Sequence, residues 1–228
     1  MNRKQYLINR LSVKSFEVSL CERNYIRDFI ETWHYSKNIN GVRSDYCFSL
    51  KNNEELIGGC IFGKMAMANQ WKKYGKTEND VIELRRLCCI DDTPKNTESY
   101  FIGQCLSWLA YNTSIKTVVS YADPYYGHEG TIYKATNFEN IGTTSKGRVI
   151  IYGGKRYHDK TIRTKYKGKL KPFAIEVRQA LDNGYAYYEK TPGKIIYTFD
   201  LTKHKRRNQR NHSRSLNTNT LPLSSDLT

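Results

Sequence analysis

The sequence lacks the features that would place the protein in a membrane or on a secretion route. No stretch approaches the roughly 20 apolar residues that a membrane-spanning helix needs. The first ten residues, MNRKQYLINR, carry charge without an apolar segment, so we expect no signal peptide there. These absences predict a cytoplasmic protein with no membrane partner.

The sequence also lacks cysteines at the spacing of a metal site. A structural zinc site usually needs closely spaced Cys or His ligands, such as a C-x-x-C pair. The cysteines instead lie singly or as a doublet in apolar or strand-like runs, and we expect buried thiols without a chemical role. They are six in number: Cys21, Cys47, Cys60, Cys88, Cys89 and Cys105.

Acidic residues are scarce relative to basic ones. The 228 residues include 37 Lys or Arg and 22 Asp or Glu, which gives a formal net charge of +15. This excess favours an anionic partner such as nucleic acid. The 18 tyrosines favour the same partner, because aromatic rings stack on bases while cations contact phosphates.

The hydrophobic pattern predicts an α/β fold. Expected strands lie at 15–19, 46–50, 56–62, 81–90, 117–121, 140–144 and 148–152, and expected helices at 22–33, 97–112 and 131–136. This order resembles that of GNAT-type acyltransferases, which implies a GNAT-like mixed, mostly antiparallel sheet flanked by helices. Gly58 and Gly59 predict a bulge or a close backbone approach inside one strand, and we expect Trp33 in the core.

Composition divides the chain into three parts. Residues 1–153 are expected to form a GNAT-like catalytic core. A basic C-terminal part packed on this core is expected over 154–202, with a helix at 172–183 and a last strand at 194–200. Residues 203–228 have almost no apolar content, which predicts a disordered basic and polar tail.

The most informative stretch runs from Val119 to Gly142. Asp123 ends an apolar strand, His128 follows on a Gly-rich loop, and Tyr133 lies in the short helix. A carboxylate at such a position can act as a base or hold a metal, and it can also simply cap the loop. Tyr133 is a candidate proton donor or a core residue, and His128 a candidate metal ligand, proton shuttle or loop-ordering residue.

Two further segments carry candidate site residues. His34 and Tyr35 end the first expected helix and suit the lip of a pocket, although His34 at that position can also cap the helix dipole. In the strand VIELRRLCCI, alternation places Glu83 beside Arg85, whereas Arg86 shares its face with Leu84 and Cys88. Arg86 then needs a partner, because a buried guanidinium without one is costly. The partner is expected to be Asp123 on a neighbouring strand or an anionic substrate. The alternative is that Arg86 forms a buried ion pair with a purely structural role.

Together these segments resemble the phage Mom family of DNA-modifying proteins. The resemblance rests on three motifs that span roughly residues 30–145. They are HYS at 34–36, ELRRL at 83–87, and ADP at 122–124 leading through GHEGTIYKATNF at 127–138 to Gly142.

The resemblance implies a GNAT-related enzyme that adds a carbamoylmethyl-type group to the exocyclic amine of adenine. This modification protects phage DNA from restriction, so the implied location is the cytoplasm of a bacterial host. The family's essential residues would fall on Tyr35, Arg86 (or Arg85), Asp123 and Tyr133. An iron requirement is associated with the family, which makes His34, Asp123 and His128 candidate ligands.

One departure concerns the acyl donor. GNAT enzymes hold the coenzyme A pyrophosphate with a glycine-rich loop before the long helix, but this chain has DDTPKNTE at 91–98. Two acids and a proline are poorly suited to a pyrophosphate. Both acetyl-CoA and aminoacyl-tRNA therefore stay open as donors, and tRNA joins DNA as a candidate partner.

These observations predict acyl or aminoacyl transfer to a DNA adenine, with catalytic residues Asp123, Tyr133, Arg86, Tyr35 and His34. Substrate contacts are expected from Arg85, His128, Tyr125, Lys155, Arg156, Lys165 and Lys167. The alternatives are a non-catalytic nucleic-acid-binding protein and an N-acetyltransferase of another substrate.

Overall fold

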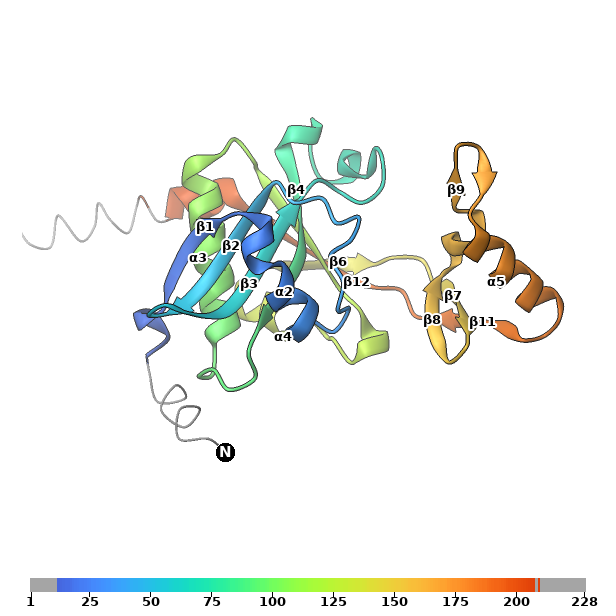
Figure 1. Ribbon diagram of the computed structural model, residues 1–228. Helices are drawn as coiled ribbons and strands as arrows, with labels where there is room; N and C mark the ends of the chain where they lie inside the picture. Colours follow the sequence, from blue (N-terminus) through green and yellow to red (C-terminus); the bar gives the residue numbers. More distant parts are fainter. Residues whose placement is uncertain (1–11, 208, 210–228) are drawn as a thin grey trace, which may run out of the picture. The chain divides into compact units, whose positions relative to one another are not determined.

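The computed structural model describes residues 12–207 and 209 of the chain (Figure 1). These residues divide into two compact units. The first comprises residues up to Ser120, Thr131–Asn140 and those from Tyr197 onward, and the second comprises Tyr121–Gly130 and Ile141–Ile196. None of the helices in the described part of the chain is long and apolar enough to cross a membrane.

A seven-stranded sheet with the order β1-β2-β3-β4-β5-β12-β6 organises the first unit. The strands are β1 (Glu17–Cys21), β2 (Tyr46–Asn52), β3 (Glu55–Gly63), β4 (Val81–Cys89), β5 (Thr117–Ala122), β6 (Glu139–Thr143) and β12 (Ile195–Asp200). The helices are α2 (Arg23–Trp33), α3 (Thr97–Asn112) and α4 (Thr131–Ala135), with short 3-10 turns at Val13–Ser15, Gln70–Lys73 and Glu78–Asp80. The ladders from β1 to β4 are antiparallel and β4 pairs with β5 in parallel, so the expected mixed, mostly antiparallel sheet is confirmed.

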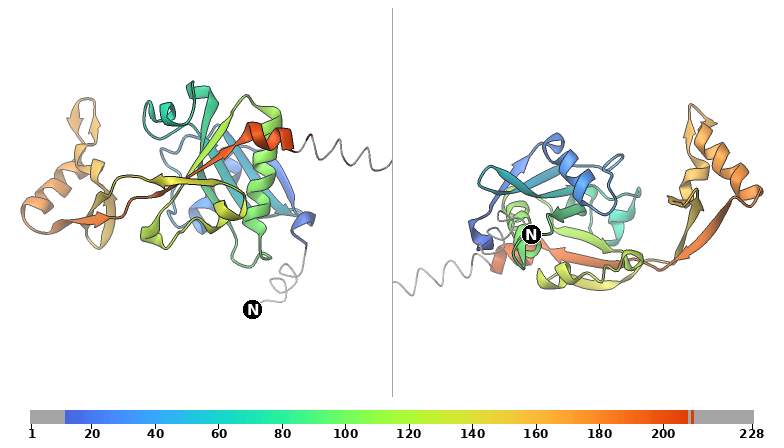
Figure 2. Two further views of the ribbon diagram at one scale, coloured as in Figure 1. Left: turned by 180° about the vertical axis from the view of Figure 1, so that it is seen from behind. Right: turned by 60° about the horizontal axis from the view of Figure 1, so that its bottom comes forward.

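The side-chain period of the strands divides the core into two layers. Cys47 and Ile61 pack with Ile26 and Ile30 of α2 on one face. Phe48, the next residue of β2, meets Trp108 of α3 on the other face, with ring centroids 5.5 Å apart. Figures 1 and 2 show the two helices on opposite sides of the sheet.

The expected close approach at the paired glycines is confirmed. A Cβ on Gly59 would lie 3.1 Å from Ile30, and one on Gly58 would lie 3.0 Å from the Cys89 Sγ. The ladder of β2 and β3 also shifts register between Leu50 and Lys51, which marks a bulge beside Gly58. Gly59 therefore lets α2 rest directly on the sheet, whereas Gly58 leaves room for the Cys89 and Leu50 side chains.

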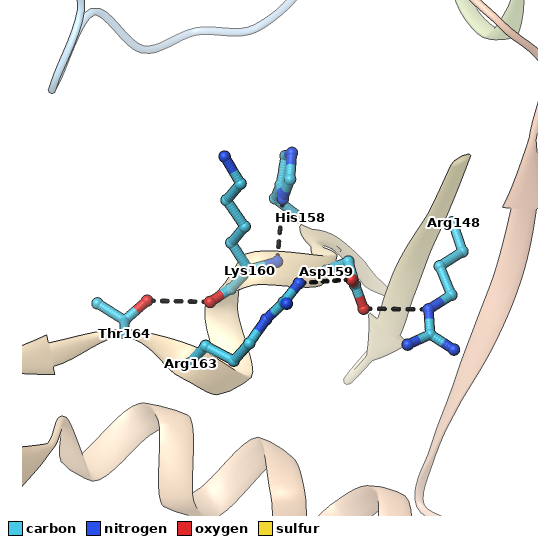
Figure 3. A network of polar contacts seen from close by, with 6 residues as sticks. All are labelled: Arg148, His158, Asp159, Lys160, Arg163 and Thr164. Atoms are coloured by element: carbon cyan, nitrogen blue, oxygen red, sulfur yellow. Dashed lines mark hydrogen bonds and ion pairs between the residues drawn. The ribbon is translucent and has the colours of Figure 1, made fainter. Parts of the chain in front are cut away.

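The second unit is built on a three-stranded sheet with the order β11-β7-β8. Its elements are a 3-10 turn at Pro124–Tyr126, β7 (Gly147–Tyr152), β8 (Lys155–His158), a 3-10 turn at Asp159–Arg163, β9 (Lys165–Tyr166), β10 (Lys169–Leu170), α5 (Pro172–Asp182) and β11 (Ala186–Thr191). Val177 and Ala180 of α5 pack on Ile150, which is fully buried. In the turn after β8, Asp159 accepts from Arg148 at 3.2 Å and from Arg163 at 2.9 Å (Figure 3).

The strand over 148–152 is expected in the main sheet, but it belongs to the three-stranded sheet instead. Gly153 and Gly154, at φ +55° and +70°, form a two-residue turn that pairs Tyr152 with Lys155. Positive φ at both turn residues matches the twist of a tight hairpin, so β7 folds onto β8 instead. The expected boundary between residues 153 and 154 falls within this hairpin, whereas the strand expected at 194–200 joins the main sheet as β12.

The tail expected from residue 203 is helical at its start. Residues 201–207 form a helix, and Asp200 Oδ1 accepts hydrogen bonds from the backbone N–H of Thr202 (2.9 Å) and Lys203 (3.1 Å). Leu201 is buried, and His204 Nε2 lies 3.0 Å from Ser107 Oγ of α3. This cap and these contacts stabilise a segment whose composition alone predicts disorder. Residues 208 and 210–228 of the expected tail lie outside the described residues.

Candidate active site

Two adjacent arginines on β4 have different surroundings. Arg85 Nη1 donates to Glu83 Oε2 at 3.0 Å, and the two side chains are only 13% and 11% exposed. Glu83 Oε2 also accepts from the Ala66 backbone N–H at 3.2 Å. The expected pairing of Glu83 with Arg85 is thus confirmed, and it forms a buried ion pair within the first unit.

Arg86 is turned away from Leu84 by a bulge. The ladder of β3 and β4 pairs Ile61 with Arg86 but Phe62 with Leu84, so Arg85 is the extra residue. Paired residues in a ladder point to the same side, and Arg86 therefore shares the face of Ile61 while Leu84 shares that of Phe62. The expectation that Arg86 and Leu84 lie on one face is wrong, because the bulge breaks the alternation.

The partners of Arg86 are backbone carbonyls. Its Nε–H and Nη2–H donate to the Asn38 carbonyl at 3.3 and 3.2 Å, and its Nη1–H donates to the Arg85 carbonyl at 2.7 Å. Burial lowers the pKa of Arg86 below its ordinary value. Within the described part of the first unit, no carboxylate forms an ion pair with this guanidinium, and its pairing with Asp123, which belongs to the second unit, stays a prediction. A cation held by neutral oxygens keeps its attraction for an anionic group.

Tyr133 and Tyr35 belong to the same unit as Arg86. Tyr133 is half-buried in α4, and its ring packs on Tyr197 and Phe138 at centroid distances of 5.1 and 5.4 Å. Burial raises the pKa of Tyr133 to about 12, and Tyr35 adds to the rise. Tyr35 also acts on the pKa of Arg86 in the opposite direction to burial. The charge of Tyr35 therefore acts on the pKa values of both Arg86 and Tyr133 in the first unit.

The end of α2 places His34 inward and Tyr35 outward. His34 is buried, and its Nδ1 accepts from the Ser36 backbone N–H at 3.1 Å, whereas Tyr35 is 48% exposed. Tyr35 thus fits the expected lip, but His34 does not. The core position expected for Trp33 is wrong, since its side chain is 47% exposed. The helix ends after Trp33, and the extended backbone of His34 turns the imidazole inward in its place.

Asp123 belongs to the second unit and is buried there. Its Oδ2 pairs with Lys194 Nζ at 3.2 Å, and its Oδ1 accepts from the Tyr125 backbone N–H at 3.2 Å. The residue therefore does cap the loop, as one of the readings of the sequence expects. Lys194 was not among the sequence candidates, because it lies far along the chain and no local pattern connects it to Asp123.

The loop after Asp123 brings Tyr125 and Tyr126 against Arg156 of β8. The Arg156 guanidinium lies 3.8 Å from the Tyr125 ring centroid, and its Nη1–H donates to the Tyr126 hydroxyl at 2.9 Å. His128 is exposed, 6.5 Å from the Tyr126 ring. The other substrate candidates in this unit, Lys155, Lys165 and Lys167, are exposed.

The described residues do not assemble a metal site. Within them, no group of three or more His, Cys, Asp or Glu side chains is placed to hold a metal ion. Both Asp123 oxygens and the Nδ1 of His34 already have hydrogen-bonding partners. The iron expected from the family resemblance thus has no ligand set here, and no step below depends on it.

Comparison with known proteins assigns a family. Residues 15–220 match the Mom protein family. The methylcarbamoylase mom of Escherichia phage Mu is 30% identical over 146 residues, which are 62% of this chain and 59% of that protein. The chain thus matches 59% of this relative's length.

Several solved acetyltransferase structures are similar in outline. A Bacillus subtilis acetyltransferase in complex with CoA has a TM-score of 0.47 at 12% identity, covering 81% of this chain and 98% of that one. A SpeG spermidine N-acetyltransferase variant from Vibrio cholerae has a TM-score of 0.49 at 9% identity, covering 86% and 99%. The Arabidopsis thaliana NAA60 in complex with acetyl-CoA has a TM-score of 0.48 at 9% identity, covering 82% and 99%. Because the family match extends over residues 15–220, the chain belongs to the Mom protein family.

Proposed function

We propose that this protein is a transferase that modifies the exocyclic amine of adenine in phage DNA and thereby protects that DNA from restriction. The observation that carries the proposal is the match to the Mom family over 15–220, in a chain whose first unit holds Tyr35, Arg86 and Tyr133, three of the four residues that the family resemblance marks as essential. The net charge of +15 suits a polyanionic substrate.

The proposed reaction is acyl or aminoacyl transfer. The adenine N6 attacks the carbonyl carbon of the donor, an N–C bond forms, and the bond from that carbon to the leaving group breaks. Asp123 accepts the proton that N6 loses. Tyr133, whose phenol is protonated at neutral pH, gives its proton to the leaving group. Arg86 stabilises the negative charge that develops on the carbonyl oxygen.

The adenine must leave the base stack to react. In duplex DNA its amine pairs with thymine, and enzymes that act on such atoms flip the nucleotide out. Tyr35, half exposed at the end of α2, is proposed to stack on or border the flipped base. The basic segment 155–171 is proposed to hold flanking phosphates, and the donor is acetyl-CoA or an aminoacyl-tRNA.

Asp123→Asn tests the base. The amide keeps an oxygen for the Tyr125 N–H but cannot take a proton, so modified adenosine should fall at least roughly 100-fold while DNA binding stays near wild type. Mass spectrometry of nucleosides from cells expressing each variant gives the product level.

Asp80→Asn is the matched control, because Asp80 is another buried aspartate that pairs with a lysine, Lys116, and accepts from a backbone N–H, and it lies outside the residues proposed to contact substrate. It should leave the product level unchanged. Wild-type product from the Asp123 variant would remove this residue from the mechanism. Tight DNA binding by the wild-type protein without any mass shift on adenosine would favour the non-catalytic binder instead.

Isotopically labelled glycine distinguishes the donors. Label in the modified adenosine would support a glycyl-type donor, and an unlabelled product would favour acetyl-CoA.

A further inference from the structure

The three-stranded sheet of the second unit has one face covered by α5 and one face that α5 does not cover. The register aligns Tyr188, Ile150 and Tyr157 across the strands, and Ile150 packs on Val177 of α5. Side chains alternate along each strand. The neighbouring row, Tyr187, Ile151 and Arg156, therefore lies on the face opposite α5.

Two aromatic rings contact Arg156 on this opposite face, and a third, that of Tyr187, belongs to the same row on strand β11. Tyr187 is 59% exposed, and Tyr125 and Tyr126, which both contact Arg156, are 41% and 44% exposed. The Tyr125 and Tyr126 rings meet edge to face at 5.2 Å. We name Tyr125, Tyr126, Arg156 and Tyr187 the tyrosine face.

Two buried polar atoms at the tyrosine face lack hydrogen-bond partners in the described part of the chain. They are Nε of Arg156 and Oε1 of Glu189. Glu189 shares this face by alternation with Tyr187, and its charge raises the pKa of Tyr125. Unsatisfied buried donors and acceptors are rare in folded proteins and often mark a place that a ligand or water completes.

The charge of the second unit suits a polyanion. Its two segments hold thirteen Lys or Arg against six Asp or Glu, together with nine of the chain's 18 tyrosines. Exposed rings set among cations are how proteins bind single strands, because an unpaired base stacks on a ring while its phosphate meets a cation. In a duplex the base faces are already stacked and cannot use such rings.

We propose that the tyrosine face binds unpaired bases of a DNA strand by stacking. The inference rests on the proposed function in one respect: flipping an adenine out of a duplex leaves its thymine partner unpaired. The tyrosine face would then recognise the opened strand, while the exposed lysines of the same unit contact its phosphates.

Binding of the full-length protein to a fluorescein-labelled oligothymidylate of roughly 12 nucleotides tests the inference. In fluorescence anisotropy without any acyl donor, Tyr187→Ala should weaken binding roughly tenfold, since stacking on one ring contributes that much. Binding to a duplex of the same length should change less than about twofold, because duplex binding depends on phosphates. Tyr187→Phe keeps the ring and should bind as wild type.

Tyr25→Ala is the matched control. Tyr25 lies in α2, is 46% exposed and has Lys51 Nζ 5.3 Å from its ring centroid. Its loss should leave oligothymidylate binding unchanged. Equal affinities for wild type and the Tyr187→Ala variant, or an equal loss in the Tyr25→Ala variant, would overturn the inference. Oligothymidylate holds no adenine, so a failure of adenine modification would leave this result standing.

Discussion

Single residues of β4 show how neighbours in sequence take different roles. Arg85 is held by the Glu83 carboxylate, whereas Arg86 is held by the Asn38 and Arg85 carbonyls. The sequence leaves open which arginine is functional. Because the Glu83 carboxylate already holds Arg85, we predict that Arg86 rather than Arg85 contacts an anionic group.

Replacing each arginine with Met separates these roles. Arg85→Met removes the cation that pairs with buried Glu83 and should lower the free energy of unfolding by about 3 kcal/mol. Arg86→Met breaks only bonds to carbonyls and should cost about 1 kcal/mol, but it should abolish modified adenosine. Urea denaturation and nucleoside mass spectrometry measure the two effects. Loss of product from the first variant alone would reverse the assignment.

At the scale of elements, local irregularities decide what each strand and helix presents. The bulge at Arg85 directs Arg86 to the α2 face of the sheet. The ladder between β4 and β5 covers only three pairs, Val81–Thr117 to Glu83–Val119. The bulge therefore follows directly where this ladder ends. The register of the sheet, rather than the arginine itself, thus determines the face on which Arg86 lies.

Asp200 caps the N-terminus of the helical segment that follows β12. Asp200→Ala removes the acceptor for the N–H groups of Thr202 and Lys203 and should lower the free energy of unfolding by about 1 kcal/mol. Asp200→Asn, which keeps a side-chain oxygen, should cost less. Urea denaturation of the three proteins near neutral pH measures the difference.

The same cap predicts a pH dependence. Burial acts to raise the pKa of Asp200, but the hydrogen bonds from Thr202 and Lys203 outweigh it, and the pKa lies below 3.8. A lowered pKa in the folded state means that ionised Asp200 stabilises the protein above about pH 4, and that this contribution disappears as the pH falls through the folded pKa. The stability gap between wild type and the Asp200→Ala variant should therefore narrow in acid. A gap that widens in acid would contradict the cap.

At the scale of the whole molecule, charge is the dominant property. The net charge of +15 predicts DNA binding that weakens steeply with salt, because each phosphate contact releases counterions. The lysines of the hairpin formed by β9 and β10 are exposed and are the candidates for such contacts.

Lys165→Ala combined with Lys167→Ala tests these contacts. The pair should weaken duplex binding similarly for all sequences and reduce the slope of log K against log salt by about two. Fluorescence anisotropy over a salt series gives the slope. A wild-type slope in the double variant would place the phosphate contacts elsewhere on the protein.

Much of the fold follows from the sequence alone. The period of apolar residues over 22–33 and the runs at 46–50, 56–62 and 81–90 predict α2, β2, β3 and β4 within a few residues, since local periodicity determines which side chains can be buried together. The Glu83–Arg85 pair is also predicted from the sequence, although the bulge at Arg85 breaks the alternation on which that prediction relied. The family motifs at 34–36, 83–87 and 122–138 are also short segments that can be recognised in the sequence alone.

What only the tertiary structure decided are the partners that lie far apart along the chain. The bulge at Arg85, the pairing of Asp123 with Lys194, and the burial of His34 in place of Trp33 depend on which segments pack together. Local sequence patterns do not predict such contacts, because the packing of whole elements, rather than the neighbours in sequence, determines which side chains meet. The convergence of Arg86, Asp123 and Tyr133 stays a prediction for the same reason.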